Sequence, residues 1–138
     1  SSGFHNPVKN VALAKSALKN LDLDVNLIEL KSYTKQQVCL LMNAADLLLV
    51  TSFSETGPIV VKEALACNCP IISTDVGDVK SITEKIDNCF ITSYNPNEIL
   101  EKIRIILASG LRSNGRIFIE PYGLDKVAKK VKLVYFNI

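Results

Sequence analysis

The sequence predicts an α/β domain in which helices cover both faces of a parallel sheet. Short, continuous apolar runs, which are typical of strands buried on both faces, alternate with segments whose apolar residues recur at helical spacing. Several helical segments open on their own capping signal, and no internal repeat divides the chain. Ligands of such sheets bind beyond the carboxyl ends of the strands, so we look for a functional site there.

The amino-terminal third predicts a helix followed by a strand. Asn6-Pro7 is a helix cap followed by proline, and the residues that recur at helical spacing after it are Val11, Ala14, Leu18 and Leu21. The segment 24–30, DVNLIEL, alternates apolar and polar residues and therefore predicts a strand. Because a parallel sheet normally feeds its first helix from a strand, we expect the first strand of the sheet to be missing ahead of residue 1.

The central part of the chain predicts two helices around a buried strand. Thr34 and Gln37 fit a capping box, which opens a helix with its apolar side at Val38, Leu41, Met42 and Ala45. The run LLLVTS over 47–52 predicts a strand buried on both faces. Gly57-Pro58 then opens a helix over 59–67.

The remaining elements continue the alternation. IISTD over 71–75 and CFITS over 89–93 predict two more buried strands, separated by a turn at 76–78 and a short helix over 79–84. Asn95-Pro96 predicts another helix start, and the helix should bury Ile99, Ile103, Ile106 and Leu107. A polar stretch over 109–116 precedes an amphipathic helix over 124–136.

Composition indicates one globular domain over residues 1–138. The chain is 48% hydrophobic and 22% charged, and its net charge of +2 gives no reason to expect nucleic acid as a partner. It has four cysteines, Cys39, Cys67, Cys69 and Cys89, without the spacing of a zinc or redox motif. We therefore expect no metal site, and structural thiols in a reducing, cytoplasmic compartment. No apolar run is long enough to cross a membrane.

A cluster of lysines near the carboxyl terminus leaves two interpretations open. The cluster comprises Lys126, Lys129, Lys130 and Lys132. It is either the solvated face of a helix or a contact with anionic lipid headgroups or a phosphate-bearing acceptor. Under the second interpretation the protein would be cytoplasmic with peripheral contact at the inner face of the membrane.

The loop after the strand at 47–52 carries the strongest candidate site. Glu55 lies in that loop, Gly57 permits tight backbone geometry, and Pro58 opens the next helix. Free backbone N–H groups near Ile59, Val60 and Val61 favour an anion such as a diphosphate. Glu63 follows Glu55 by eight residues, so the two carboxylates could hold a sugar and a ribose on either side of a phosphate.

Residues 45–78 resemble the E-x7-E element of glycosyltransferase family 4, which belongs to the two-domain class called GT-B. The blocks AADLLLVTS, SETGPIVVKEALAC and NCPIISTDVGDV follow the order and spacing of that family, and NPVKNVALAKSAL and FITSYNPNEILEKI extend the resemblance to roughly 100 residues. It implies a Rossmann-like three-layer sandwich with a parallel sheet, the carboxyl-terminal, nucleotide-sugar-binding domain of a group 1 enzyme. The amino-terminal acceptor domain of such an enzyme would be absent from this chain.

The resemblance also implies residue roles. Glu55 would contact the donor sugar, Glu63 would contact the ribose hydroxyls, and Lys9 would neutralise the diphosphate leaving group, so we assign Glu55 and Lys9 as catalytic. Other substrate-binding residues would be Thr56, Gly57, Pro58, Ile59 and Val60 at the sugar and phosphates, with Leu30 and Lys31 facing the base.

The implied activity is hexosyl transfer with retention of configuration. The donor would be a UDP- or GDP-hexose, the acceptor a glycan or lipid-linked glycan, and no metal or cofactor is expected. The role would be polysaccharide or cell-surface glycan biosynthesis, and the isolated chain would be inactive without its acceptor domain.

Three departures from the family pattern keep a second function open. Phe4 stands where the family has an arginine, Pro58 lacks an N–H, and Ser81 stands where a glutamate is common. Phe4 and Pro58 favour the alternative of a non-catalytic nucleotide-binding domain with the same fold. Polar residues after the strand at 71–75 fit turn chemistry and substrate contact equally well, namely Ser73, Thr74, Asp75 and Gly77.

Overall fold

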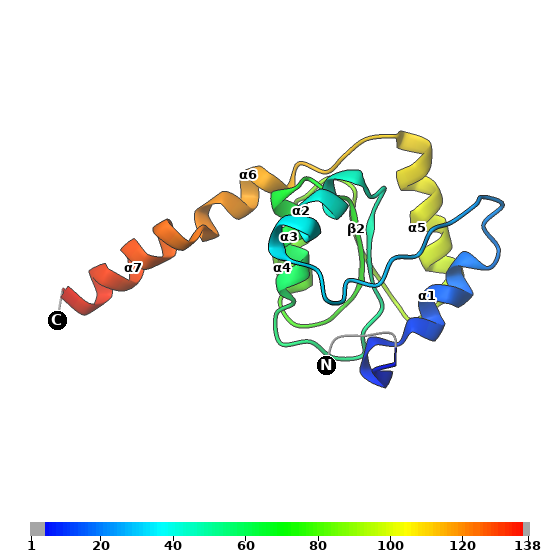
Figure 1. Ribbon diagram of the computed structural model, residues 1–138, viewed down its shortest axis with the longest axis horizontal. Coiled ribbons are helices and arrows are strands. Elements are labelled where there is room, and N and C mark those ends of the chain that lie inside the picture. The colour runs from blue at the N-terminus through cyan, green and yellow to red at the C-terminus, as the bar shows by residue number, and fades with distance from the viewer. Residues whose placement is uncertain (1–4, 137–138) are drawn as a thin grey trace.

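The computed structural model describes residues 5–136 and is built around a parallel sheet of three strands. The strands are β1 (Leu48–Val50), β2 (Ile71–Thr74) and β3 (Cys89–Thr92), in the order β1-β2-β3. Leu49 lies opposite Ile72, which in turn lies opposite Phe90. Helices cover both faces of this sheet (Figure 1), which confirms the predicted Rossmann-like α/β fold.

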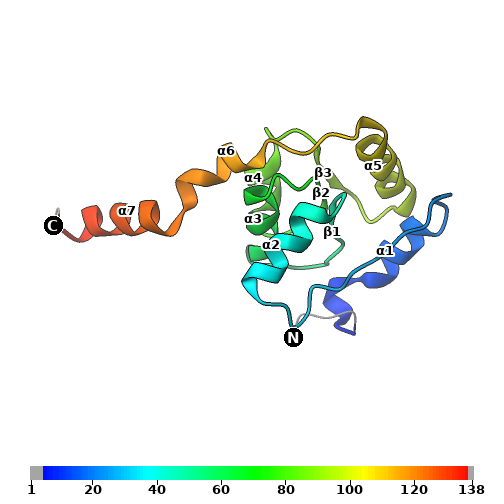
Figure 2. The ribbon, with the colours of Figure 1, turned by 45° about the horizontal axis from the view of Figure 1, so that its top comes forward.

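The strand β2 lies at the centre, and all four of its residues are buried. Its side chains alternate between two apolar clusters because successive residues of a strand point to opposite faces. Ile71 joins the cluster under α2 (Lys35–Ala44), α3 (Ile59–Ala66) and α4 (Val79–Thr83). Ile72 joins the cluster under α1 (Val11–Leu18) and α5 (Pro96–Ser109), on the other side of the sheet (Figure 2).

The predicted caps account for where the helices begin. The Thr34 hydroxyl accepts a hydrogen bond from the Gln37 N–H at 3.2 Å, and the Gln37 side chain accepts one from the Thr34 N–H at 2.9 Å. Asn95 caps α5 in a similar way. Asn6 caps a 3-10 turn, η1 (Pro7–Lys9), and not one continuous helix, because Asn10 adopts a left-handed conformation (φ 49°) and separates η1 from α1.

The strand predicted over 24–30 is wrong. Those residues pass between α1 and α2 without joining the sheet, and Val25 and Ile28 are 41% and 45% exposed. Only part of the segment reaches the core, where Leu30 packs against the cluster beneath α3. Alternation requires one face to be apolar, but it does not supply a neighbouring strand with which to form a ladder.

The carboxyl-terminal part contains a short helix and a 3-10 turn that the sequence pattern does not predict, next to the polar stretch over 109–116. After α5, Arg112 donates hydrogen bonds to the carbonyls of Ala45 (2.6 Å), Met42 (2.6 Å) and Cys67 (3.2 Å). Then α6 (Gly115–Ile119) packs so closely on α3 that a Cβ at Gly115 would lie 2.6 Å from Leu65 Cδ2.

A short turn, η2 (Glu120–Tyr122), links α6 to α7 (Leu124–Phe136), which has the predicted bounds. Figures 1 and 2 both show α7 extending away from the body of the domain. Of the helices within residues 5–136, none is long and apolar enough to cross a membrane.

Candidate functional site

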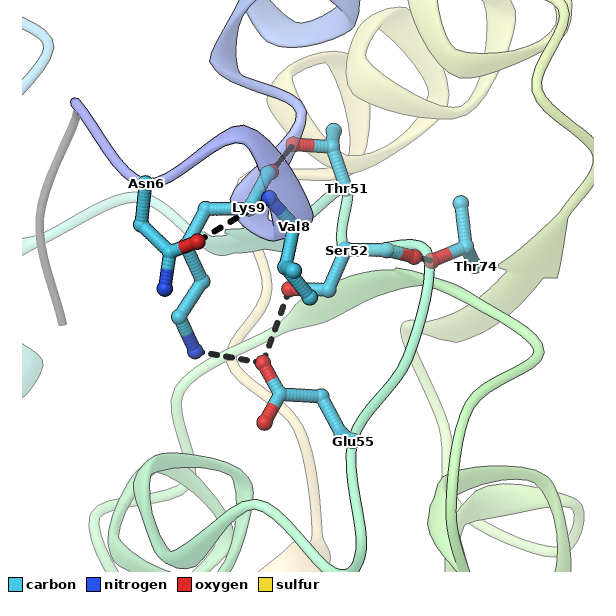
Figure 3. A network of polar contacts seen from close by, with 7 residues as sticks. All are labelled: Asn6, Val8, Lys9, Thr51, Ser52, Glu55 and Thr74. Carbon is cyan, nitrogen blue, oxygen red and sulfur yellow. Dashed lines mark hydrogen bonds and ion pairs between the residues drawn. The ribbon is translucent and has the colours of Figure 1, made fainter. Parts of the chain in front are cut away.

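Polar contacts gather beyond the carboxyl end of β1. Thr51 and Ser52 directly follow this strand, and both are buried. The Thr51 hydroxyl donates to the Lys9 carbonyl at 3.0 Å, and the Phe53 N–H donates to the Val8 carbonyl at 2.8 Å. These two bonds hold η1 against the loop after β1, and this contact places Lys9 above the sheet edge (Figure 3).

Lys9 and Glu55 form the centre of this site. The Lys9 Nζ lies 2.5 Å from Glu55 Oε1, and the Ser52 hydroxyl donates to the same oxygen at 2.8 Å. The Thr74 hydroxyl, at the end of β2, donates to the Ser52 carbonyl at 2.7 Å and so fixes the start of the loop. Among the described residues, no hydrogen bond reaches Glu55 Oε2, which leaves that oxygen open to a ligand (Figure 3).

The charge of Glu55 is stabilised by its partners. Burial by itself would raise the pKa of this carboxyl, but the hydrogen bonds from Lys9 and Ser52 and the positive charge of Lys9 together hold the pKa below its ordinary value. Glu55 is therefore an ionised hydrogen-bond acceptor at neutral pH. Such a group suits the binding of hydroxyls.

The loops that follow β1 and β2 cross in direct contact. Gly77 has a left-handed conformation (φ 55°), and a Cβ there would lie 2.9 Å from the Glu55 carbonyl oxygen and 2.9 Å from the Gly57 nitrogen. Only glycine tolerates both the left-handed conformation and the lack of space for a Cβ. Lys62 and Asp78 link the second loop to α3 through an ion pair of 3.0 Å, while Asp78 Oδ1 is buried and has no hydrogen-bond partner among the described residues.

The amino terminus of α3 is open. Pro58 is the residue before the helix and not its first residue, and no side chain within residues 5–136 caps the helix. The N–H groups of Ile59 and Val60 therefore have no acceptor within the helix. Ile59 is 72% exposed and Thr56 is also exposed, so the side chains next to this end of the helix reach solvent. Free N–H groups and the helix dipole favour an anion at this position.

The structure places the remaining predicted residues in different surroundings. Glu63 is half-buried on α3, and no described residue forms an ion pair with its carboxylate. The side chains of Val60 and Leu30 pack against the core, whereas Lys31 is exposed. The proposed contacts of Leu30 and Lys31 with a base therefore stay a prediction. Phe4 lies outside the described residues.

The sequence prediction missed several polar residues that build the site. The sequence pattern predicts Thr51 and Ser52 only as the end of a strand, and nothing in it indicates the ion pair between Lys62 and Asp78. A polar pair directly after a buried apolar run is the signal that could have identified the first two. Ser73 and Thr74 hydrogen-bond to backbone carbonyls and are buried, which favours the structural role left open for them.

Fold and site together define a Rossmann-like α/β domain with a polar site at the carboxyl edge of its sheet. A family model described as "Glycosyl transferases group 1" matches residues 6–119. This chain belongs to the group 1 glycosyltransferases.

Two relatives show the same relationship. An uncharacterized glycosyltransferase of Methanocaldococcus jannaschii is 30% identical over 124 residues, which cover 86% of this chain and 35% of that protein. TuaC of Bacillus subtilis, a glycosyltransferase whose name provisionally assigns it to teichuronic acid biosynthesis, is 43% identical over 60 residues, which cover 44% of this chain and 15% of that protein. The chain thus spans about a third or less of the length of these relatives.

Proposed function

We propose that this chain is the donor-binding domain of a retaining glycosyltransferase, which transfers a hexosyl group from a UDP- or GDP-sugar. The observation that carries the proposal is the pair formed by Lys9 and Glu55 beside the open start of α3. The pair joins residues that are 46 positions apart in the sequence, at the edge of the sheet where ligands of this fold bind.

Each group at the site has a role in this proposal. The N–H groups of Ile59 and Val60 and the amine of Lys9 face the diphosphate, and they stabilise the negative charge that grows as the bond from sugar to phosphate breaks. The open Oε2 of Glu55 accepts hydrogen bonds from sugar hydroxyls. Glu63, farther along the same helix, accepts the ribose hydroxyls. We assign no nucleophile and no metal or cofactor.

We extend the proposal to the acceptor of the transferred sugar. The whole enzyme would carry a second domain that binds a glycan or lipid-linked acceptor, and the present chain alone would bind donor without transferring sugar. Polysaccharide or cell-surface glycan biosynthesis is the proposed role, in the cytoplasm. The exposed lysines of α7 would contact anionic lipid at the inner face of the membrane.

Nucleotide titration tests donor binding. Calorimetry with UDP, GDP, UDP-glucose and GDP-mannose should show binding of one nucleotide and its sugar. Lys9→Met should weaken that binding about tenfold or more, because a cation beside the diphosphate is lost. Lys15→Met, which removes an exposed lysine from α1, is the matched control and should bind as the wild type does. A folded sample that binds none of the four compounds contradicts the proposal.

A non-catalytic nucleotide-binding domain is the second candidate. Pro58 supports it, because the residue before α3 has no N–H to offer a phosphate. Sugar transfer by the full-length protein separates the two candidates. Transfer that is lost in Lys9→Met supports the enzyme, whereas nucleotide binding without transfer to any glycan acceptor supports the second candidate.

A further inference from the structure

Two cysteine thiols lie in contact between α2 and α3, away from the polar site. Cys39 lies on α2 and is exposed, while Cys67 directly follows α3 and is buried. Their sulfur atoms are 3.7 Å apart, although the residues are 28 positions apart in the sequence. The sulfur of Cys67 also lies 3.9 Å from the Cys39 carbonyl oxygen. The fold thus brings together two thiols whose spacing in the sequence matches no known paired motif.

Neighbouring groups hold the two helices in this arrangement. The Asn43 side chain donates to the Cys39 carbonyl at 2.8 Å and reaches the Cys39 sulfur at 3.5 Å. On the other side, Arg112 binds the carbonyl of Cys67 and two carbonyls at the carboxyl-terminal end of α2. The Asn43 amide thus lies beside one sulfur, and the positive charges of Arg112 and Arg116 lie near the other, where they lower the pKa of Cys67 without offsetting the rise that burial causes.

The two thiols differ in access to solvent, and this difference sets the order of reaction. Burial, together with the hydrogen bond and charge of Cys39, raises the pKa of Cys67, so Cys67 keeps its proton at neutral pH. Cys39 is open to solvent and is therefore the thiol that meets an external reagent first.

We propose that Cys39 and Cys67 are a redox-active pair, which a small-molecule disulfide such as oxidised glutathione converts into a disulfide that links α2 to α3. The Cys39 thiolate attacks one sulfur of the reagent, forms a mixed disulfide and releases one thiolate. Cys67 loses its proton to solvent and attacks the Cys39 sulfur, which forms the protein disulfide and releases the second reagent thiolate. Two protein thiols are oxidised and one reagent disulfide is reduced to two thiols.

The other two cysteines serve as internal controls. Burial raises the pKa of Cys69 to about 11 and that of Cys89 to about 12. Cys69 is fully buried, and Cys89 is half-buried within β3. The folded chain should therefore oxidise at one pair of thiols and leave the other pair free.

Thiol counting with peptide mapping tests the proposal. The folded chain is incubated with oxidised glutathione, quenched in acid and then unfolded for titration. Four free thiols should fall to two, and digestion should yield one peptide pair joined through Cys39 and Cys67. Retention of all four thiols, a link to Cys69 or Cys89, or a dimer joined through Cys39 would overturn the proposal.

Two variants distinguish the pair from a single reactive thiol. Cys67→Ser should stop at the mixed disulfide, so its mass increases by one glutathione, whereas Cys39→Ser should keep its three remaining thiols. Circular dichroism shows that each variant is folded before it is used. If the wild type also stops at the mixed disulfide, Cys39 is merely an exposed thiol and the pair does not exist in solution.

Discussion

Lys9 and Glu55 neutralise each other in this structure, so under the proposed function a diphosphate would share Lys9 with a carboxylate. The attraction for an anion then depends strongly on the free N–H groups at the start of α3. Glu55 in turn opposes a bare diphosphate by its charge but offers an acceptor to sugar hydroxyls. One residue would thereby favour the intact donor over the nucleotide that remains after transfer.

Replacement of Glu55 by glutamine should separate these two effects. In Glu55→Gln the affinity for UDP or GDP should stay the same or rise, because Lys9 is released from its ion pair. The affinity for the nucleotide sugar should fall about tenfold, since a charge-assisted hydrogen bond to the sugar is lost. Calorimetry with both ligands measures the ratio, and Glu101→Gln on the exposed face of α5 is the control. An equal loss of affinity for both ligands would show that Glu55 does not bind the sugar.

The pair formed by Lys9 and Glu55 should also leave a signature in acid. Because the pKa of Glu55 is lowered in the folded state, its stabilisation is present above the ordinary value of 4.5 and is lost as the pH falls through the lowered value. At neutral pH, Glu55→Gln should lower the free energy of unfolding by up to about 1 kcal/mol. Urea titrations from neutral pH into acid should show this difference shrinking as the pH falls below the ordinary value of 4.5 and through the lowered pKa of Glu55. A difference that is constant over this range would contradict the assignment.

At the scale of elements, one arginine joins three segments of the chain. Arg112 binds carbonyls at the end of α2 and just after α3, from the stretch that links α5 to α6. These carbonyls lie at the carboxyl-terminal ends of two helices, where the helix itself offers no N–H donor to them. The Arg112 guanidinium donates to all three carbonyls and so caps the ends of both helices.

Arg112→Ala should therefore destabilise the domain by about 2 kcal/mol, because three hydrogen bonds from a charged group are lost and two partly buried carbonyls lose their donor. Arg104→Ala is the matched control, since Arg104 donates a single bond to the Asn20 carbonyl at the surface. Its effect should be about 0.5 kcal/mol. Chemical denaturation of both variants gives the comparison, and similar losses in the two would mean that the triple contact has no special role.

The elements also show which features local sequence can specify. The capping box at Thr34, the cap at Asn95 and the apolar runs of the three strands are local signals, and each was predicted. The break at Asn10 depends on a left-handed residue that the helical periodicity does not reveal. The helix α6 depends on contact with Leu65, which lies 50 positions earlier in the chain. The polar residues around α6 therefore do not predict this helix.

The candidate site likewise combines features that local sequence predicts with features that depend on contacts between distant segments. The positions of Glu55 and the start of α3 were predictable because strand, loop and helix are contiguous in the sequence. The family resemblance assigned Lys9 to the diphosphate, but the ion pair between Lys9 and Glu55 was not predicted. The supporting hydroxyls of Thr51 and Ser52 and the link between Lys62 and Asp78 are set by packing between segments, which a single sequence does not display.

At the scale of the whole molecule, α7 stands apart from the folded body. Every residue over 120–132 is exposed, and within the described chain α7 packs mainly against η2. Removal of 124–138 should therefore change the free energy of unfolding by no more than about 0.5 kcal/mol. Removal of 115–138 should cost much more, because α6 packs on α3. Thermal unfolding of the two truncated chains measures both effects, and a large loss in the shorter deletion would show that α7 docks on the domain.

The crossing of the loops after β1 and β2 has a consequence for engineering. A methyl group at Gly77 would strike the backbone of both Glu55 and Gly57, so neither turn can change shape while the other stays as it is. Grafting the first turn from a relative with different donor selectivity should therefore fail unless the second turn is transplanted with it. In a directed-evolution library, productive variants at these two places should arise as coupled pairs and seldom as single substitutions.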